Sequence, residues 1–267
     1  MPVAFMDIIC TDFDGTIYTE FAMPPIPADF DKLITEFQKN GGIWVINTGR
    51  DITSLMESLG RSHLNIKPDW LVVVERSIFK RQGHQYVAHE PWNQRCEDAH
   101  KKLWEQAADA FVDLRKWIDT HFDATLYSDE WSPVSIIASS NTELNEIQKG
   151  IEEHMAGIPD LEFVRNDVYA RFASKDFSKG TALAEISRAT GKDAENIFAI
   201  GDHWNDMAML DTAHAGMIAC PANAIPAVRE RVESEGGYLC DEYEGKGTVE
   251  ALVHFNPEFS SILETKI

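Results

Sequence analysis

The chain has 267 residues, and its 24 Lys and Arg against 44 Asp and Glu give a formal net charge of −20. A field this negative repels phosphodiester backbones and anionic head groups, and the basic residues form no cluster, so nucleic-acid and membrane partners are not expected. Hydrophobic residues make up 44% of the chain and charged residues 25%, which excludes a disordered chain. The length allows one large domain or a domain that carries an insertion.

The absence of a recognisable targeting signal and the spacing of the cysteines predict a cytoplasmic protein. The N-terminus lacks the basic start and the apolar run of a signal peptide, and no apolar stretch is long enough to cross a bilayer. The cysteines are far apart and form no metal-binding pattern, so we expect buried, reduced thiols at Cys10, Cys96, Cys220 and Cys240.

The first 75 or so residues alternate short apolar strands with amphipathic helices, which is the pattern of a parallel sheet. Helices are predicted between Asp29 and Gly41 and between Asp51 and Gly60, where apolar residues recur at helical spacing. Strands are predicted at 6–10, 43–46 and 70–74.

From about Ser77 the pattern changes. A hairpin around Gly83 precedes a long segment with helical spacing from Trp92 to His121. Strands at 134–138 and 163–172, with a helix between them, complete an α+β insertion.

The first pattern then resumes with a helix from Lys179 to about Ala189, a strand at 197–200, a helix after Asn205, a strand at 217–220 and a last helix around Val228. We therefore expect an α/β fold in which a Rossmann-like parallel sheet carries helices on both faces. Residues 1–80 and 172–267 would form this core, and residues 81–171 an inserted α+β domain.

The first strand ends in Asp12-Phe13-Asp14-Gly15-Thr16, at the edge of the sheet where α/β proteins place their sites. Of two neighbouring carboxylates, one can act as nucleophile while the other transfers protons. A simple turn is the alternative, since Asp and Gly favour turns.

Two further segments suit a phosphate group. Asn47-Thr48-Gly49-Arg50 offers a hydroxyl and free N–H groups before a helix, and Lys179 opens the helix after the insertion. Taken alone, Thr48 fits a local cap equally well and Lys179 a solvated surface residue.

The segment Gly201-Asp202-His203-Trp204-Asn205-Asp206 follows a buried strand. Carboxylates at this spacing suit Mg²⁺, which prefers oxygen ligands. Asn205 fits the N-cap of a helix as an alternative.

Together these segments resemble the motifs of the haloacid dehalogenase superfamily: DxDGT at Asp12, the second motif at Thr48, the third at Lys179 and GDxxND at Asp202. The last motif is similar to that of the Cof-like phosphatases and their sugar-phosphatase relatives. The insertion lies where that family has its type C2 cap.

The resemblance implies a role for each matching residue. Asp12 attacks phosphorus to form an aspartyl-phosphate, and Asp14 protonates the leaving oxygen and then activates water. Asp12, Asp202 and the main-chain carbonyl of Asp14 hold Mg²⁺, and Asp206 assists at the metal or orients Lys179. The expected phosphate-binding residues are Thr48, Gly49, Lys179 and Asn205.

The function implied is a Mg²⁺-dependent phosphatase for a small phosphorylated metabolite, with a sugar phosphate favoured. The alternatives are a non-catalytic phosphometabolite sensor and a phosphotransferase on the same fold. The chain departs from its Cof-like relatives after the third strand, where Glu75-Arg76-Ser77 replaces an Asn-Gly pair, and oligomeric state is not predicted.

Overall fold

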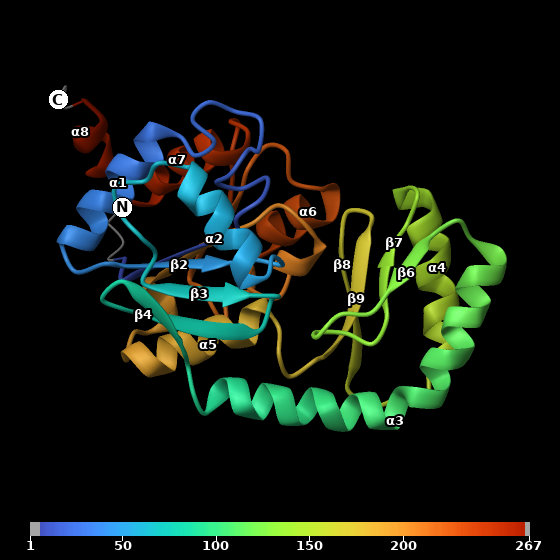
Figure 1. Ribbon diagram of the computed structural model, residues 1–267. Helices are drawn as coiled ribbons and strands as arrows, with labels where there is room; N and C mark the ends of the chain where they lie inside the picture. Colours follow the sequence, from blue (N-terminus) through green and yellow to red (C-terminus); the bar gives the residue numbers. More distant parts are fainter. Residues whose placement is uncertain (1–5, 265–267) are drawn as a thin grey trace. The chain divides into compact units, whose positions relative to one another are not determined.

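A computed structural model describes residues 6–264, which form two compact units (Figure 1). One unit contains the described residues up to His89 together with those from Lys179 onward, and the other is Glu90–Ser178. Both joins fall later than the expected 80/81 and 171/172. The reason is strand pairing: residues 81–88 extend the sheet of the first unit, and residues 172–174 still belong to a strand of the second.

The first unit is built on an eight-stranded sheet. Its strands are β1 (Ile8–Thr11), β2 (Ile43–Asn47), β3 (Trp70–Val73), β4 (Ser77–Gln82), β5 (Gln85–Ala88), β10 (Ile197–Ile200), β11 (Met217–Cys220) and β12 (Tyr238–Leu239). They lie in the order β12-β11-β10-β1-β2-β3-β4-β5. β4 is antiparallel to both of its neighbours, β3 and β5, and all other neighbouring strands are parallel. The predicted parallel sheet and the hairpin at Gly83 are confirmed.

Helices cover both faces of this sheet, as expected. They are α1 (Ala28–Lys39), α2 (Ile52–Arg61), α5 (Lys179–Thr190), α6 (Pro226–Ser234), α7 (Glu244–Phe255) and α8 (Phe259–Glu264). The connections β1-α1-β2 and β2-α2-β3 progress in one direction along the sheet, so right-handed crossovers place α1 and α2 on one face, and α5 lies on the other (Figure 1). Asp51 caps α2, because its side chain accepts the N–H of Ser54.

The second unit packs two helices on a small antiparallel sheet. Its elements are α3 (Trp92–His121), β6 (Thr125–Tyr127), β7 (Ser135–Ile137), α4 (Asn141–His154), β8 (Leu161–Asn166) and β9 (Tyr169–Ser174). The strand order is β6-β7-β9-β8. Trp104 and Trp117 pack against the apolar core of this unit, so both side chains have a structural role.

Two expectations from the sequence are wrong. The segment 163–172 forms no single strand, because Asp167 adopts a left-handed backbone with φ of 51° and turns the chain between β8 and β9. The helix expected after Asn205 is replaced by one 3₁₀ turn, Trp204–Asp206, followed by further turns. Asp206 causes this change, since its side chain accepts main-chain N–H groups that precede it and closes the segment into a loop.

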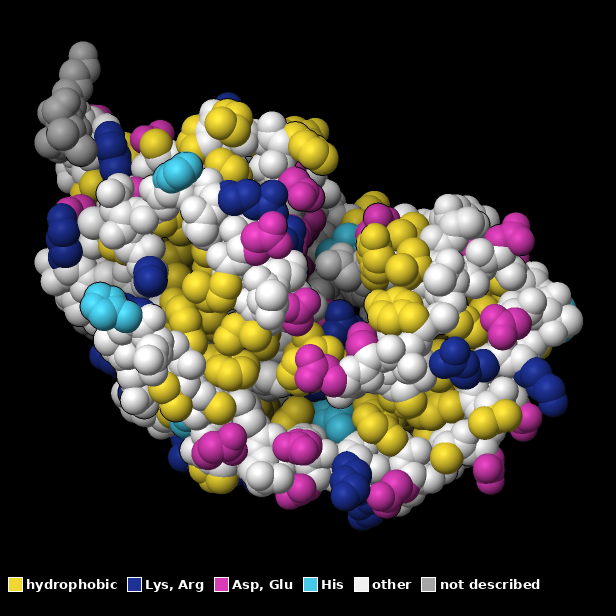
Figure 2. Space-filling model, in the orientation of Figure 1, with side chains coloured by type: hydrophobic (Ala, Val, Ile, Leu, Met, Phe, Trp, Pro, Cys, Tyr) yellow, Lys and Arg dark blue, Asp and Glu magenta, His cyan; other side chains and the backbone are white. Residues whose placement is uncertain are grey.

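The distribution of basic residues on the surface and the burial of the thiols agree with the expectations from the sequence. Lys and Arg side chains are scattered over the face seen in Figure 2, with no extended basic patch. No helix within residues 6–264 has both the length and the apolar character to cross a membrane. All four cysteines are buried and free, and burial raises the pKa of the Cys10 thiol to about 12, which leaves it unreactive.

Candidate active site

The motif residues meet at one edge of the eight-stranded sheet because three neighbouring strands end at the same level. Thr11, the last residue of β1, pairs with Ile46 of β2 and with Ile200 of β10. The segments that follow these strands are DxDGT, NTGR and GDxxND. The carboxyl ends of parallel strands therefore bring together residues that are far apart in the sequence.

Lys179 joins the third motif to the first and the fourth. Its side chain is fully buried, and Nζ lies 2.6 Å from Oδ1 of Asp12 and 2.6 Å from Oδ1 of Asp206. Burial by itself lowers the pKa of the ammonium group, but the charges of the two carboxylates outweigh burial and hold the pKa above its usual value. Lys179 therefore remains charged and is no surface residue.

Both carboxylate oxygens of Asp206 accept hydrogen bonds from protein groups. Its second carboxylate oxygen, Oδ2, accepts the main-chain N–H groups of Asp202 and His203, both at 2.9 Å. A Cβ atom at Gly201 would come within 2.4 Å of the Asp206 carboxyl carbon, so this position requires glycine. These contacts give Asp206 the geometry of a residue that orients Lys179 and the loop.

Asp12 and Asp202 face each other across the hydroxyl group of Thr16. Thr16 Oγ1 donates to Asp202 Oδ1 at 3.1 Å and lies 3.4 Å from Asp12 Oδ2. Burial raises the pKa of Asp12 well above its usual value, and the charge of Asp206 adds to the effect. Burial and then the charge of Asp206 also raise the pKa of Asp202, to about 7.

This acidic cluster fits a divalent cation. One ligand oxygen each from Asp12, Asp202 and Asp206 can be chosen so that all three lie within 4.8 Å of one another. Lys179 supplies a single positive charge against three carboxylates, and hard oxygen donors are the ligands that Mg²⁺ prefers. A bound cation would relieve the repulsion that the raised pKa values report.

Asp14 lies outside this cluster. Its carboxylate is 43% exposed and pairs with the guanidinium group of Arg50 through two hydrogen bonds. Arg50 ends the segment Asn47-Thr48-Gly49-Arg50, in which only Thr48 and Gly49 were expected to have a role. Its position directly after Thr48-Gly49 is the one signal in the sequence that pointed to it.

The expected phosphate-binding residues Thr48, Gly49 and Asn205 meet at Glu75. The Glu75 carboxylate accepts the Nδ2 group of Asn205 at 3.0 Å, and a Cβ atom at Gly49 would lie 3.1 Å from the same oxygen, Oε1. The main-chain N–H of Glu75 donates to the carbonyl of Thr48 at 3.0 Å, with Glu75 in the left-handed region at φ of 69°. Thr48 Oγ1 also accepts the N–H of Arg50 at 3.1 Å. The cap considered for Thr48 is provided by Asp51, which is the N-cap of α2.

Asn205 is not the N-cap of a helix. The residue at the N-cap of the 3₁₀ turn is His203, and the side chain of Asn205 is directed to Glu75. Glu75 was noted in the sequence only as a departure from the family pattern, and its contact with Asn205 depends on a distant segment.

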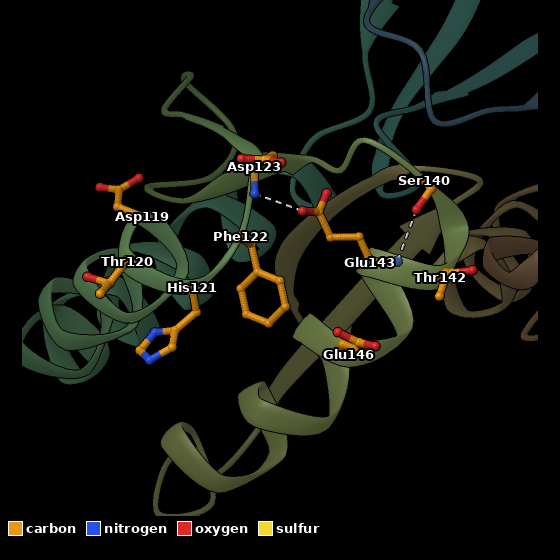
Figure 3. A pocket seen from close by; sticks show the side chains of 9 residues that line it. All are labelled: Asp119, Thr120, His121, Phe122, Asp123, Ser140, Thr142, Glu143 and Glu146. Atoms are coloured by element: carbon orange, nitrogen blue, oxygen red, sulfur yellow. Dashed lines mark hydrogen bonds between the residues drawn. The ribbon is translucent and has the colours of Figure 1, made fainter.

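The hollow shown in Figure 3 is a different feature, formed within the second unit by the end of α3 and the start of α4. It has a volume of about 500 Å³ and contains none of the predicted site residues. Glu143, the carboxylate that points into its centre, is engaged by the main-chain N–H groups of Asp123 and Ser139. Glu143 therefore stabilises the segments before α4.

Arg165 is a buried basic residue on β8 of the second unit. Its guanidinium group donates to the side chains of Asn141, Asn145 and Gln148 on α4. These contacts hold β8 to α4 and give Arg165 a structural role within the second unit.

The α/β fold and the motifs that meet at the edge of its sheet are those expected of a haloacid dehalogenase-like hydrolase, and comparisons with known proteins agree. The chain belongs to the haloacid dehalogenase-like hydrolase family, which matches residues 75–237. The resemblance stated from the motifs is thereby confirmed, and the chain is a phosphoric monoester hydrolase.

Two relatives and one solved structure illustrate the similarity. The chain is 26% identical over 250 residues to a phosphoglycolate phosphatase of Methanoculleus marisnigri. The alignment covers 93% of this chain and 96% of the relative. The chain is 24% identical over 259 residues to the 5-amino-6-(5-phospho-D-ribitylamino)uracil phosphatase YcsE of Bacillus subtilis, with 93% and 95% covered. The sucrose-phosphatase of Synechocystis sp. PCC6803, solved with sucrose and phosphate, superimposes with a TM-score of 0.71 at 17% identity, covering 94% of this chain and 98% of the other.

Proposed function

We propose that the protein is a Mg²⁺-dependent phosphatase that hydrolyses a small phosphorylated metabolite through an aspartyl-phosphate on Asp12. The observation that carries this proposal is the buried contact of Lys179 with Asp12 and Asp206. It provides a carboxylate nucleophile beside a positive charge, and both side chains are buried. Phosphoryl transfer needs such positioning and electrostatic stabilisation more than covalent chemistry by several groups.

In the first step an oxygen of Asp12 attacks phosphorus, and the bond from phosphorus to the ester oxygen breaks. Asp14 donates a proton to that leaving oxygen, so the alcohol departs neutral. In the second step Asp14 takes a proton from water, whose oxygen attacks phosphorus and releases inorganic phosphate and the Asp12 carboxylate. Lys179, Thr48, Gly49 and Asn205 are the groups we assign to the phosphoryl oxygens.

The residues that would hold Mg²⁺ are Asp12, Asp202 and the main-chain carbonyl of Asp14, with Asp206 orienting Lys179. The cation supplies positive charge to the phosphoryl oxygens. Burial and mutual repulsion make the cluster unfavourable as a set of bare anions, as the raised pKa values of Asp12 and Asp202 indicate. This supports a requirement for a cation at this position.

We assign substrate selection to the inserted unit, as the cap of the enzyme, and favour a sugar phosphate as substrate. The relatives named for phosphoglycolate, a phosphoribitylamino-uracil and sucrose phosphate share a small phosphate monoester. A panel of phosphorylated sugars, polyols and glycolate would rank these classes by kcat/KM.

The test of the activity is release of inorganic phosphate from p-nitrophenyl phosphate with Mg²⁺. We expect activity in the wild type, its loss in Asp12→Asn and its loss on chelation with EDTA. Asp7→Asn is a matched control, because Asp7 forms a comparable 2.6 Å pair with Lys192 before the other end of β1. Absence of metal-dependent turnover on every phosphoester tested would refute the proposal and favour the sensor.

A further inference from the structure

Asn223 lies in the loop after β11, and its side chain joins two segments of the candidate active site. Its Nδ2 group donates to the main-chain oxygen of Gly15 at 2.8 Å and to Oδ2 of Asp202 at 3.2 Å. Its Oδ1 atom accepts the main-chain N–H of Glu244 at 2.7 Å. Only one orientation of the amide satisfies all three contacts, since a flipped amide would bring its oxygen against two acceptors.

The carboxylate that Asn223 contacts lies directly against the first motif. Gly15 has a φ of +68°, and a Cβ atom there would come within 2.5 Å of Asp202 Oδ2. Asp202 Oδ1 accepts a hydrogen bond from Thr16, and Oδ2 accepts one from Asn223. Each oxygen thus accepts a hydrogen bond from a different loop and keeps lone pairs free for another ligand.

The residue that holds the side-chain oxygen of Asn223 lies at the start of a helix. Glu244 is the first residue of α7, and Thr248 in the next turn of that helix donates to the main-chain oxygen of Thr16 at 2.7 Å. The main-chain N–H of Ile225 donates to the carbonyl of Asp202 at 3.0 Å. The loop after β11 therefore holds both the main chain and the side chain of Asp202.

We propose that Asn223 is a positioning residue for the metal site, which fixes the carboxylate of Asp202 against the Gly15 loop in the orientation that binds the divalent cation. The inference rests on the proposed function, because Asp202 is a metal ligand only there. Hydrogen-bonding partners of ligands determine how much reorganisation metal binding requires. Their loss typically weakens metal affinity about 10- to 100-fold.

The experiment measures binding of Mn²⁺ to the substrate-free protein by electron paramagnetic resonance, with Mg²⁺ as competitor. Asn223→Ala is expected to raise the dissociation constant for Mn²⁺ about tenfold or more. Asn223→Leu, which keeps the volume of the side chain and removes its donor, is expected to do the same. Added metal should then restore part of the phosphatase activity lost in either variant.

Asn196→Ala is the matched control. Asn196 donates to Oδ2 of Asp7 at 3.2 Å, the same type and length of contact as that of Asn223 with Asp202, beyond the opposite ends of β1 and β10. Its loss should lower the melting temperature to a similar extent and leave the dissociation constant for Mn²⁺ unchanged.

The outcomes separate the two proposals. Wild-type protein that binds Mn²⁺ and hydrolyses p-nitrophenyl phosphate, with Asn223 variants of unchanged affinity, overturns the role of Asn223 alone. Wild-type protein that binds no divalent cation overturns this inference and the metal-dependent function together. A tenfold loss shared by Asn196→Ala would show a general effect of stability and would also overturn the inference.

Discussion

The guanidinium group of Arg50 holds the carboxylate of Asp14 through two hydrogen bonds, from Nε to Oδ2 at 2.7 Å and from Nη2 to Oδ1 at 2.6 Å. Arg50 is itself held, since it lies over the rings of Phe13 and Tyr18 and donates to Ser58 at 2.7 Å. A planar arginine in such a setting orients a carboxylate more strictly than a lysine would. The orientation of the proposed proton donor is therefore set by the second motif.

Arg50→Ala should lower kcat for an alkyl phosphate by about 10²-fold, because Asp14 then loses the orientation in which it protonates the leaving oxygen. The loss should be smaller with p-nitrophenyl phosphate, whose leaving group needs little protonation. Steady-state kinetics on both substrates provide the measurement. Arg61→Ala serves as control, since Arg61 forms an exposed ion pair with Glu57 on α2. Equal losses on the two substrates would contradict a role through Asp14.

Lys179→Met should lower the free energy of unfolding by about 3 to 5 kcal/mol in the presence of EDTA, because it leaves Asp12 and Asp206 buried without a counter-charge. Urea denaturation followed by circular dichroism measures the change. Lys192→Met breaks the more exposed pair with Asp7 and should lower the free energy by no more than about 1 kcal/mol. Similar losses of unfolding free energy in the two variants would show that burial does not increase the contribution of the Lys179 ion pairs to stability.

Glu75→Ala should raise the inhibition constant of inorganic phosphate about tenfold, because the amide of Asn205 loses the partner that directs it. Glu75→Gln retains a side-chain oxygen that can accept from Asn205, so its inhibition constant should stay close to that of the wild type. Competition by phosphate against p-nitrophenyl phosphate gives both constants. Equal weakening in the two variants would indicate that the charge of Glu75 matters, and not its contact with Asn205.

Glu185 should make stability depend on pH below 5. Its hydrogen bond with Arg188, together with that to His89, lowers the pKa of Glu185 from its ordinary 4.5 to about 2. The stabilisation is therefore fully present above about pH 4.5 and is lost as the pH falls toward 2.

The variant Glu185→Gln tests this dependence. It should be about 1 kcal/mol less stable than the wild type at pH 6, since the exposed arginine is screened by solvent, and the difference should shrink at pH 3. Thermal unfolding at several pH values measures it. Glu57→Gln, in an exposed pair, is the control and should show no such trend. A difference that is constant from pH 6 to pH 3 would contradict the assignment.

The strand-end motifs could be located from the sequence because they depend on local patterns. Apolar runs such as Ile197–Ile200 are buried on both faces of a parallel sheet, and the residue after such a run stands at its carboxyl edge. Asp12 and Asp202 were therefore predicted to meet, and the resemblance to the family added Lys179 and Asp206. The structure brings the four side chains together.

The local patterns were insufficient where a side chain overrides the periodicity. The segment after Asn205 has apolar residues at helical spacing, yet Asp206 binds the main chain before it and closes a turn. Between β8 and β9, Asp167 reverses a chain that reads as one strand. In both cases a single polar residue determines the backbone conformation, and the spacing of apolar residues does not predict this effect.

The sequence by itself determined the alternation of strands and helices through most of the first unit, the family and the set of acidic and basic groups at one edge of the sheet. Tertiary structure alone decided their partners: Arg50 for Asp14, Glu75 for Asn205 and Asn223 for Asp202. The physical reason is that hydrogen bonds and ion pairs depend on distances of about 3 Å between side chains from separate loops. Those distances follow from strand order and loop geometry, which periodicity along one segment does not encode.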